Sequence, residues 1–176
     1  MNRLKPDTLR KTPPTTEQVE KIKRNPLYLV LDTITDTYNT GSLFRLADAL
    51  GVTKMFLCGN MEYPPASRIH KAAVGTENWV PWEKAETTLE VIKRLQAQGV
   101  QVIAVEQDKR SVQLKDFKPT FPTALVVGNE TTGVSRQVLD KVDVIVEFPM
   151  YGINNSFNVW GSAAIVGYRL TEYLEG

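Results

Sequence analysis

The sequence predicts an α/β protein whose mostly parallel sheet is flanked by helices. Short apolar runs rich in β-branched residues alternate with helical patterns, which is typical of parallel strands joined by helices. The length of 176 residues fits one domain, and a 42% apolar composition is enough for a sizeable core. Strands are expected at residues 27–31, 54–58, 100–105, 124–127 and 144–148.

Helical spacing of apolar residues connects these strands. We expect helices at residues 41–50, 89–95, 134–142 and 157–174. Thr87 or Thr88 is placed to cap the second of these helices, Gly99 to close it, and Ser135 lies near the start of the third. Between the second and third strands, residues 66–73 are a further helix candidate. Trp79 and Trp82 are interpreted as residues of the core or of a dimer surface.

The first 26 residues form a basic N-terminal extension, and residues 27–176 form the main domain. The extension holds seven basic and three acidic groups, a net charge of +4, while the whole chain carries +1. Thr16 is expected to cap a short basic helix that runs toward Arg24. Two interpretations stay open: a solvated tail, or an arm that contacts phosphates.

Composition excludes several classes of function. One cysteine, Cys58, and one histidine, His70, cannot build a disulfide framework or a Cys/His metal cluster, so no metal is expected. Cys58 is expected inside a buried strand. No apolar run reaches the roughly 20 residues that cross a bilayer, and the N-terminus lacks a signal sequence. We expect a cytoplasmic protein that does not associate with membranes.

The first candidate segment, residues 39–45, follows the first strand and enters a helix. Gly41 allows close backbone approach at a helix start, where free N–H groups attract anions, and Arg45 lies one turn further on. Either Asn39 caps the helix and Arg45 is a surface cation, or the segment belongs to an anion-binding site.

The second segment, residues 126–133, leaves a buried strand and leads into a helix. Gly128 and Gly133 flank Glu130, which suits a loop whose backbone approaches a ligand at the carboxyl end of a strand. The dinucleotide spacing Gly-x-Gly-x-x-Gly and the phosphate loop are both absent, which disfavours NAD and nucleoside triphosphates. The alternative is an ordinary turn with a solvated Glu130.

The third segment, residues 148–159, is the most informative. A strand ends at Pro149, and a polar loop containing Gly152 follows. Amide and hydroxyl side chains then gather beside apolar residues, as a site for a small polar ligand requires: Asn154, Asn155, Ser156 and Asn158. Alternatively, Ser156 is only a helix cap.

Together, these segments resemble the three motifs of the SpoU branch of the SPOUT methyltransferases. Asn39, Gly41 and Arg45 resemble the first motif, and Gly128, Glu130 and Gly133 the second; Pro149, Met150, Gly152, Ser156 and Asn158 resemble the third. The similarity extends in order and spacing from residue 27 to the C-terminus. One departure is Trp160, which stands where the family often has a small residue.

The resemblance implies a C-terminal deep trefoil knot that binds S-adenosylmethionine, with S-adenosylhomocysteine as product. It also implies a homodimer whose substrate site combines both subunits, and methylation of a ribose 2′-hydroxyl in RNA, either tRNA or rRNA. The implied cofactor-binding residues are Val105, Gly128, Phe148, Met150, Ser156 and Phe157. The implied catalytic residues are Arg45, Asn39, Glu130, Ser156 and Asn158.

The resemblance leaves the role of Arg45 open. The family has a proposal that the corresponding arginine acts as the base, but a guanidinium stays protonated in proteins, so Arg45 more safely clamps phosphate or orients the hydroxyl. Two rival functions stay open: a non-catalytic RNA-binding protein that retains the fold, and an unrelated α/β protein that binds a nucleotide or a flavin.

Overall fold

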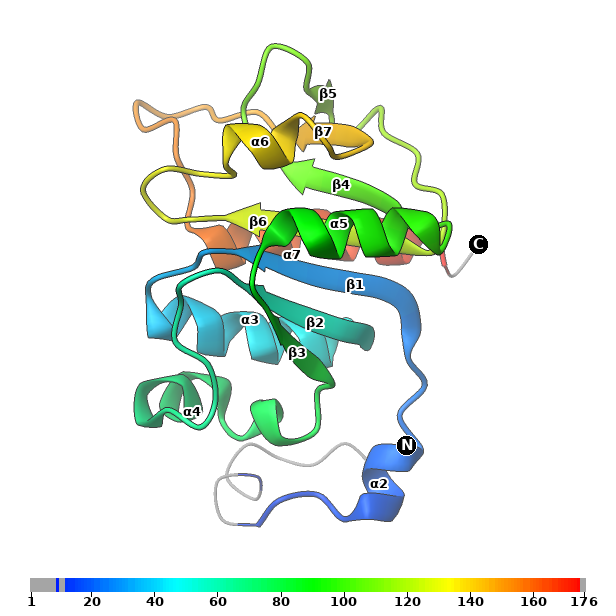
Figure 1. The fold of residues 1–176 in the computed structure, drawn as a ribbon, viewed down its shortest axis with the longest axis vertical. Helices are drawn as coiled ribbons and strands as arrows, with labels where there is room; N and C mark the ends of the chain where they lie inside the picture. Colours follow the sequence, from blue (N-terminus) through cyan, green and yellow to red (C-terminus); the bar gives the residue numbers. More distant parts are fainter. Residues whose placement is uncertain (1–8, 10–11, 175–176) are drawn as a thin grey trace.

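The central sheet contains seven parallel strands among the residues described by a computed structural model, which covers residue 9 and residues 12–174 (Figure 1). The strands are β1 (Asn25–Asp32), β2 (Val52–Cys58), β3 (Trp82–Ala85), β4 (Gln101–Val105), β5 (Val112–Gln113), β6 (Thr123–Gly128) and β7 (Val144–Glu147). Their order across the sheet is β3-β2-β1-β6-β4-β7-β5. The predicted α/β class is therefore confirmed.

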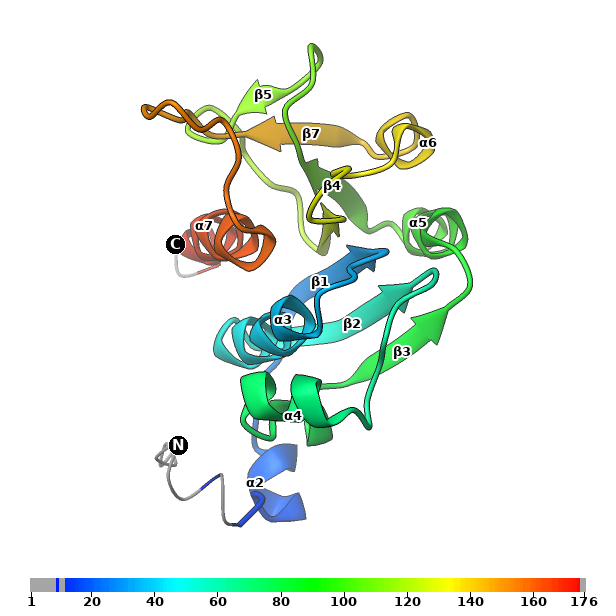
Figure 2. The same ribbon diagram turned by 90° about the vertical axis from the view of Figure 1, so that its left-hand side faces the viewer.

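Helices cover both faces of the sheet. The helices of the described part of the chain are α2 (Thr16–Glu20), α3 (Thr37–Ala49), α4 (Ser67–Ala73), α5 (Thr88–Ala97), α6 (Arg136–Leu139) and α7 (Val159–Glu172), with a 3₁₀ turn η1 (Thr76–Asn78). Figure 2 shows α3 and α7 on one face and α5 and α6 on the other. Among the helices within residues 12–174, none is both long enough and apolar enough to cross a bilayer.

The core has one apolar layer on each face of the sheet. Leu29 and Leu31 of β1 pack with residues of α3 and α7 on one face, whereas Val30 packs with residues of α5 on the other. Successive side chains of a strand point to opposite faces, so a strand buried on both sides is apolar throughout. This explains why β1 appears in the sequence as a continuous apolar run.

All five predicted strands are confirmed, and two were missed. β3 has four residues, only intermediate or exposed, and β5 has two. Both lie at the edges of the sheet, where there is little apolar periodicity to detect.

Cys58 is buried at the end of β2, as expected, and burial is the main cause that raises the pKa of its thiol to about 12. Trp79 is buried in the core.

The helix starts differ from the predictions in the first half of the chain. Asp36, not Asn39, is the N-cap of α3, because its side chain accepts the N–H of Tyr38. Asn39 therefore lies inside the helix, and its interpretation as a cap was wrong. Thr15, one residue before the expected Thr16, caps α2, which ends at Glu20.

In the second half, Thr87 caps α5 as expected, but α6 is shorter than its predicted range and Ser135 makes no capping hydrogen bond. α7 begins at Val159, and its N-cap is Asn158, whose side chain accepts the N–H of Trp160. Ser156 is thus not the cap of α7, and the alternative that reduced it to one is excluded.

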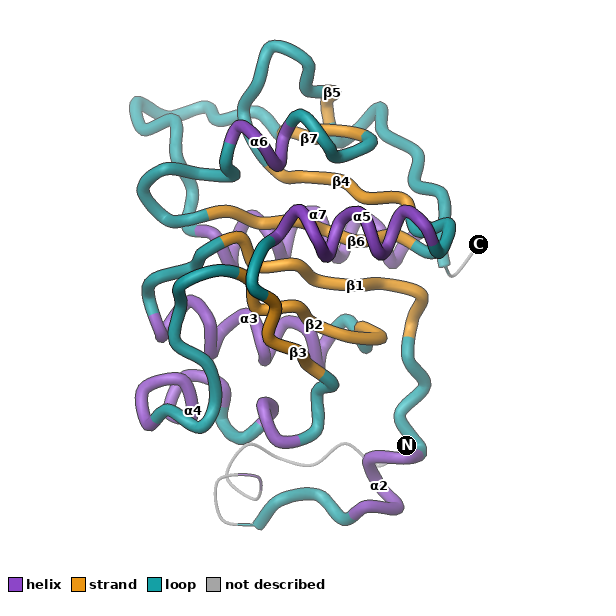
Figure 3. Tube along the Cα trace, in the orientation of Figure 1, coloured by secondary structure: helices purple, strands orange, loops and turns teal. Residues whose placement is uncertain are grey.

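The parallel strands place several loops at one edge of the sheet. The loops after β1 and β6 and the segment between β7 and α7 all lie at this edge (Figure 3). β1 and β6 end in register, with Asp32 opposite Gly128. Ligands of open α/β sheets bind at this carboxyl edge, so the fold brings all three sequence motifs toward one place.

Candidate active site

A cavity of about 670 Å³ opens at the carboxyl edge of the sheet. Three walls surround it, which we call the β4 wall (residues 105–107), the β6 wall (127–133) and the β7 wall (146–159). Thr35, Asp36 and Asn39 at the start of α3 complete the lining, together with Ser162 of α7. The volume is in the range of small-molecule and cofactor sites.

Most of the residues predicted from sequence line this cavity. They are Asn39, Val105, Gly128, Glu130, Phe148, Met150, Ser156, Phe157 and Asn158. Arg45 is not among the lining residues. The structure thus brings residues of all three motifs together but leaves Arg45 apart from them.

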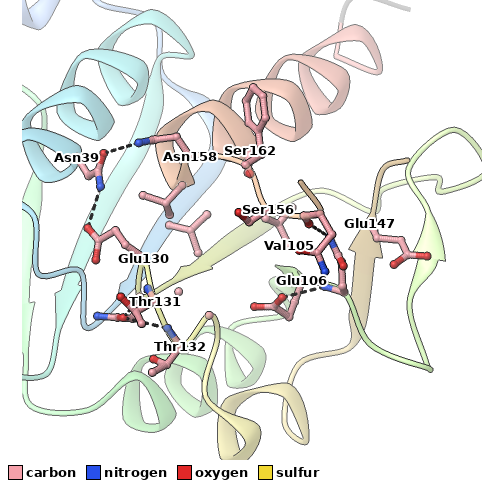
Figure 4. Close-up of a pocket in the computed structure, with 18 of the residues that line it drawn as sticks. Asn39, Val105, Glu106, Glu130, Thr131, Thr132, Glu147, Ser156, Asn158 and Ser162 are labelled. Carbon is pink, nitrogen blue, oxygen red and sulfur yellow. Dashed lines mark hydrogen bonds between the residues drawn. The ribbon is translucent and has the colours of Figure 1, made fainter. Parts of the chain in front are cut away.

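Asn39 is the point where the three motifs meet (Figure 4). Its amide nitrogen donates to Oε1 of Glu130 at 2.9 Å, and its oxygen accepts from the amide nitrogen of Asn158 at 3.1 Å. Asn39 is only 5% exposed, so water hardly reaches its side chain. Its two hydrogen bonds therefore satisfy polar atoms that would otherwise be buried without a partner. A buried amide therefore joins the loop after β6 to the start of α7.

Glu130 holds the start of α3 against the β6 wall. Its carboxylate accepts the N–H groups of Thr35 and Asp36 and the hydroxyl of Thr35, in addition to the amide of Asn39. Burial acts to raise the pKa of this carboxyl, but the hydrogen bonds from Asn39, Thr35 and Asp36 hold it below its ordinary value. Glu130 is thus a charged anchor at a helix N-terminus, where negative charge is favourable.

The β6 wall is a tight loop whose backbone closes on itself. Asn129 and Gly133 exchange backbone hydrogen bonds, and the Asn129 side chain accepts the N–H groups of Thr131 and Thr132. A Cβ at Gly128 would overlap the backbone of Gly133 and Val134. Only glycine therefore allows this loop to fold back at the end of β6.

The β7 wall combines aromatic rings with polar groups. Phe148 and Phe157 meet edge to face, with ring centroids 6.3 Å apart, and Phe157 covers Gly161 in the first turn of α7. The N–H and the hydroxyl of Ser156 both donate to the side chain of Asn154. Trp160, the departure noted from the family pattern, is 45% exposed and does not line the cavity.

Arg45 lies on the exposed face of α3. It is six residues after Asn39, which places it about 9 Å further along the helix axis and about 120° around it. Among the residues that the structure describes, none forms a hydrogen bond or an ion pair with its guanidinium. Arg45 is therefore available to a phosphate or to another protein chain.

Six polar residues of the cavity were missed by the sequence analysis: Thr35, Asp36, Glu106, Gln107, Glu147 and Ser162. Glu106 and Gln107 directly follow the apolar run of β4, and Glu147 ends β7. Polar residues immediately after buried parallel strands are the signal that would have found them, since such strand ends share one edge.

Fold and cavity define an open α/β protein with a cofactor-sized site at the carboxyl edge of a parallel sheet. The sequence profile of the SpoU rRNA Methylase family matches residues 26–168. The chain therefore belongs to this family, as the three motifs indicated.

Individual relatives agree with this membership. The tRNA (guanosine(18)-2'-O)-methyltransferase of Aquifex aeolicus is 30% identical over 153 residues, which are 87% of this chain and 72% of that protein. A crystal structure of the A. aeolicus TrmH/SpoU tRNA modifying enzyme superposes with a TM-score of 0.80 at 28% identity, over 97% of this chain and 82% of that one. An AdoMet-bound rRNA methyltransferase from Sinorhizobium meliloti gives a TM-score of 0.80 at 25% identity, over 94% of this chain but 60% of that one.

Proposed function

We propose that this protein transfers a methyl group from S-adenosylmethionine to a ribose 2′-hydroxyl of RNA. The observation that carries the proposal is the convergence of the three motifs on one cavity, through the bonds of Asn39 to Glu130 and Asn158. Relatives named for the same reaction, on guanosine 18 of tRNA or on 23S rRNA, support it.

The lining of the cavity suits this cofactor. Apolar side chains of Val105, Phe148 and Phe157 offer surfaces for an adenine ring, while Ser156 offers a polar group for ribose or amino-acid atoms. When bound, S-adenosylmethionine would supply a methyl carbon for attack by the 2′-oxygen, with the carbon–sulfur bond breaking to leave S-adenosylhomocysteine and the hydroxyl losing its proton. We assign cofactor binding to Val105, Gly128, Phe148, Met150, Ser156 and Phe157.

The threading of the C-terminal segment into a deep trefoil knot is part of this proposal. The side chain of Gln107 donates to the backbone oxygen of Asn155, so the β7 wall passes against the residues that follow β4. α7 then packs against β6, β4 and α3. A knot around the cofactor site requires the segment before α7 to lie against the end of β4 in this way.

The residues of the chain contribute orientation rather than covalent chemistry. An in-line displacement requires the attacking oxygen to be aligned with the methyl carbon and the departing sulfur. The side of the cavity that would contact the ribose is formed by Asn39, Glu130, Ser156 and Asn158. The guanidinium of Arg45 would clamp a phosphate of the RNA or orient the hydroxyl.

Arg45 can take this role if a second copy of the chain is present. It does not line the cavity of its own subunit, and the neighbouring helix α7 exposes large apolar residues, Trp160, Ile165 and Tyr168, at 45%, 41% and 55%. Contiguous exposed apolar residues are typical of protein interfaces. We therefore propose a homodimer formed through α3 and α7, in which Arg45 serves the site of the partner subunit.

Mixing two inactive variants tests this dimer. Arg45→Ala keeps an intact cavity, and Asn158→Ala keeps an intact Arg45, so a mixed dimer has one complete site. After unfolding and refolding of an equimolar mixture, we expect about a quarter of the wild-type activity, because half of the dimers are mixed and each has one working site. Activity that stays at the level of the separate variants would contradict a shared site.

The RNA substrate is tRNA or rRNA, and the basic extension of residues 1–26 is proposed to contact its phosphates. Arg3, Lys5, Arg10 and Lys11 of this extension lie outside the described residues; of the others, Lys21 and Lys23 are exposed. Replacing both lysines with glutamine is expected to lower the slope of log affinity against log salt by about 1.5. An unchanged slope would make the extension a solvated tail. Cytoplasmic location stays a prediction from the sequence.

The activity itself is tested with purified protein, labelled S-adenosylmethionine and total tRNA or rRNA. We expect label on a 2′-oxygen, mapped by resistance of the adjacent phosphodiester to alkaline hydrolysis. Tight binding of RNA without binding of S-adenosylhomocysteine would instead support the non-catalytic RNA-binding alternative.

A further inference from the structure

We propose that Glu106 and Gln107 are positioning residues that fasten the β6 wall and the β7 wall to the end of β4, so that cofactor affinity depends on them. The proposal rests on the proposed function, because it concerns the same cavity. Neither residue belongs to the three motifs. Both directly follow Val105 at the carboxyl end of β4.

Glu106 fastens the β6 wall. Its Oε2 accepts the N–H of Val134 at 2.8 Å, and its Oε1 accepts the N–H of Gln107 at 2.9 Å. A Cβ at Gly133 would overlap the Glu106 carboxylate, and Gly133 has a φ of +68°. The loop after β6 therefore ends in Gly133, where the missing side chain leaves space for the Glu106 carboxylate. This carboxylate accepts the N–H of the next residue, Val134.

Gln107 fastens the β7 wall. Its side-chain nitrogen donates to the backbone oxygen of Asn155 at 2.5 Å, directly before Ser156 and Phe157, which line the cavity. Residues 151–158 are all exposed, so little packing holds this stretch in place. A single hydrogen bond has a large influence on the position of a segment with so few buried contacts.

These bonds make the end of β4 a common support for the two other walls. The walls come from strands that do not touch each other, since β4 lies between β6 and β7 in the sheet. A ligand that contacts all three walls binds best when their spacing is already correct, because less ordering is needed on binding. Loss of either bond should therefore weaken cofactor binding without removing a group that the cofactor needs.

Calorimetric titration of the full-length protein with S-adenosylhomocysteine tests the assignment. Gln107→Ala removes the donor, and Gln107→Glu keeps the shape but cannot donate to Asn155. We expect the dissociation constant to rise about 3- to 10-fold in both, as for loss of one hydrogen bond. The thermal midpoint without cofactor should stay unchanged, because Gln107 is exposed.

Gln96→Ala is the matched control. Gln96 is also a glutamine whose amide bridges two segments, to Lys141 and Asp143, but it lies on α5, away from the cavity. It should bind S-adenosylhomocysteine as the wild type does. A second variant, Glu106→Gln, should weaken cofactor binding and raise KM for S-adenosylmethionine while KM for RNA stays constant.

The outcomes separate the two claims. A wild-type protein that does not bind S-adenosylhomocysteine overturns the proposed function. If the wild type binds but both Gln107 variants bind equally well, the positioning role is wrong. An equal loss in Gln96→Ala also overturns it, because general destabilisation would then explain the effect.

Discussion

The buried and the exposed sides of α3 differ in how the protein uses them. At the N-terminal end, Asn39 is 5% exposed and joins Glu130 to Asn158 by hydrogen bonds. One and two-thirds turns later, Arg45 is exposed and has no hydrogen bond among the described residues. Both belong to one sequence motif, yet Asn39 builds the cavity and Arg45 faces outward. A motif in the sequence can therefore serve two different surfaces.

Replacing Arg45 tests the exposed side of α3 and should have the largest effect, which is on the methylation rate. Arg45→Ala is expected to lower the methylation rate about 100-fold, because a preorganised charge at the substrate is lost. Affinity for S-adenosylhomocysteine should stay unchanged, since Arg45 does not line the cavity. Lys93→Ala, an exposed cation on α5, is the control. A wild-type rate in the Arg45 variant would remove Arg45 from the mechanism.

Replacing Asn39 tests the buried side of α3. Asn39→Ala removes two hydrogen bonds, one to Oε1 of Glu130 and one from the amide of Asn158, which should lower the free energy of unfolding by about 1–3 kcal/mol. The thermal midpoint should fall by roughly 5 °C. Asn78→Ala, at an exposed asparagine in η1, should leave the midpoint unchanged. If the two variants are equally stable in urea denaturation, the hydrogen bonds of Asn39 do not hold the site together.

The pH dependence of stability tests Glu130, which accepts a hydrogen bond from Asn39, and the expected effect is smaller. Because the hydrogen bonds lower the pKa of Glu130 in the folded state, its carboxylate stabilises the protein above the ordinary glutamate value of about 4.3. This stabilisation is lost as pH falls through the folded-state pKa. Glu130→Gln should therefore lose stability less steeply on acidification than the wild type.

Urea denaturation from about pH 6 to about pH 3 measures this difference. Glu62→Gln, at an exposed glutamate after β2, serves as control. Parallel pH profiles for the wild type and Glu130→Gln would mean that the carboxylate is not held by α3.

Much of the fold could be predicted from the sequence because buried parallel strands are apolar on both faces. β1, β2, β4, β6 and β7 were found in this way. The edge strands β3 and β5 were missed, since they are short and contain no buried residue. The start of α3 was misplaced because Asp36 and Asn39 are both good N-cap residues, and only the structure shows which one accepts the N–H.

The candidate site could be predicted in its members but not in its geometry. Motif spacing selected Asn39, Glu130 and Asn158, which the fold brings into contact over 91 and 119 residues of sequence. The different sides of α3 on which Asn39 and Arg45 lie were not predicted, because the sequence pattern started this helix after Asn39. Glu106 and Gln107 were overlooked because a carboxylate and an amide after a strand form no motif.

A crystal structure of the protein soaked with S-adenosylhomocysteine tests the central claim most directly. The account predicts density for this ligand between the β4, β6 and β7 walls, with its rings against Phe148 or Phe157 and with Asn39 still bonded to Glu130 and Asn158. Ligand bound elsewhere on the chain, or a cavity that remains solvent-filled at saturating ligand, would contradict it.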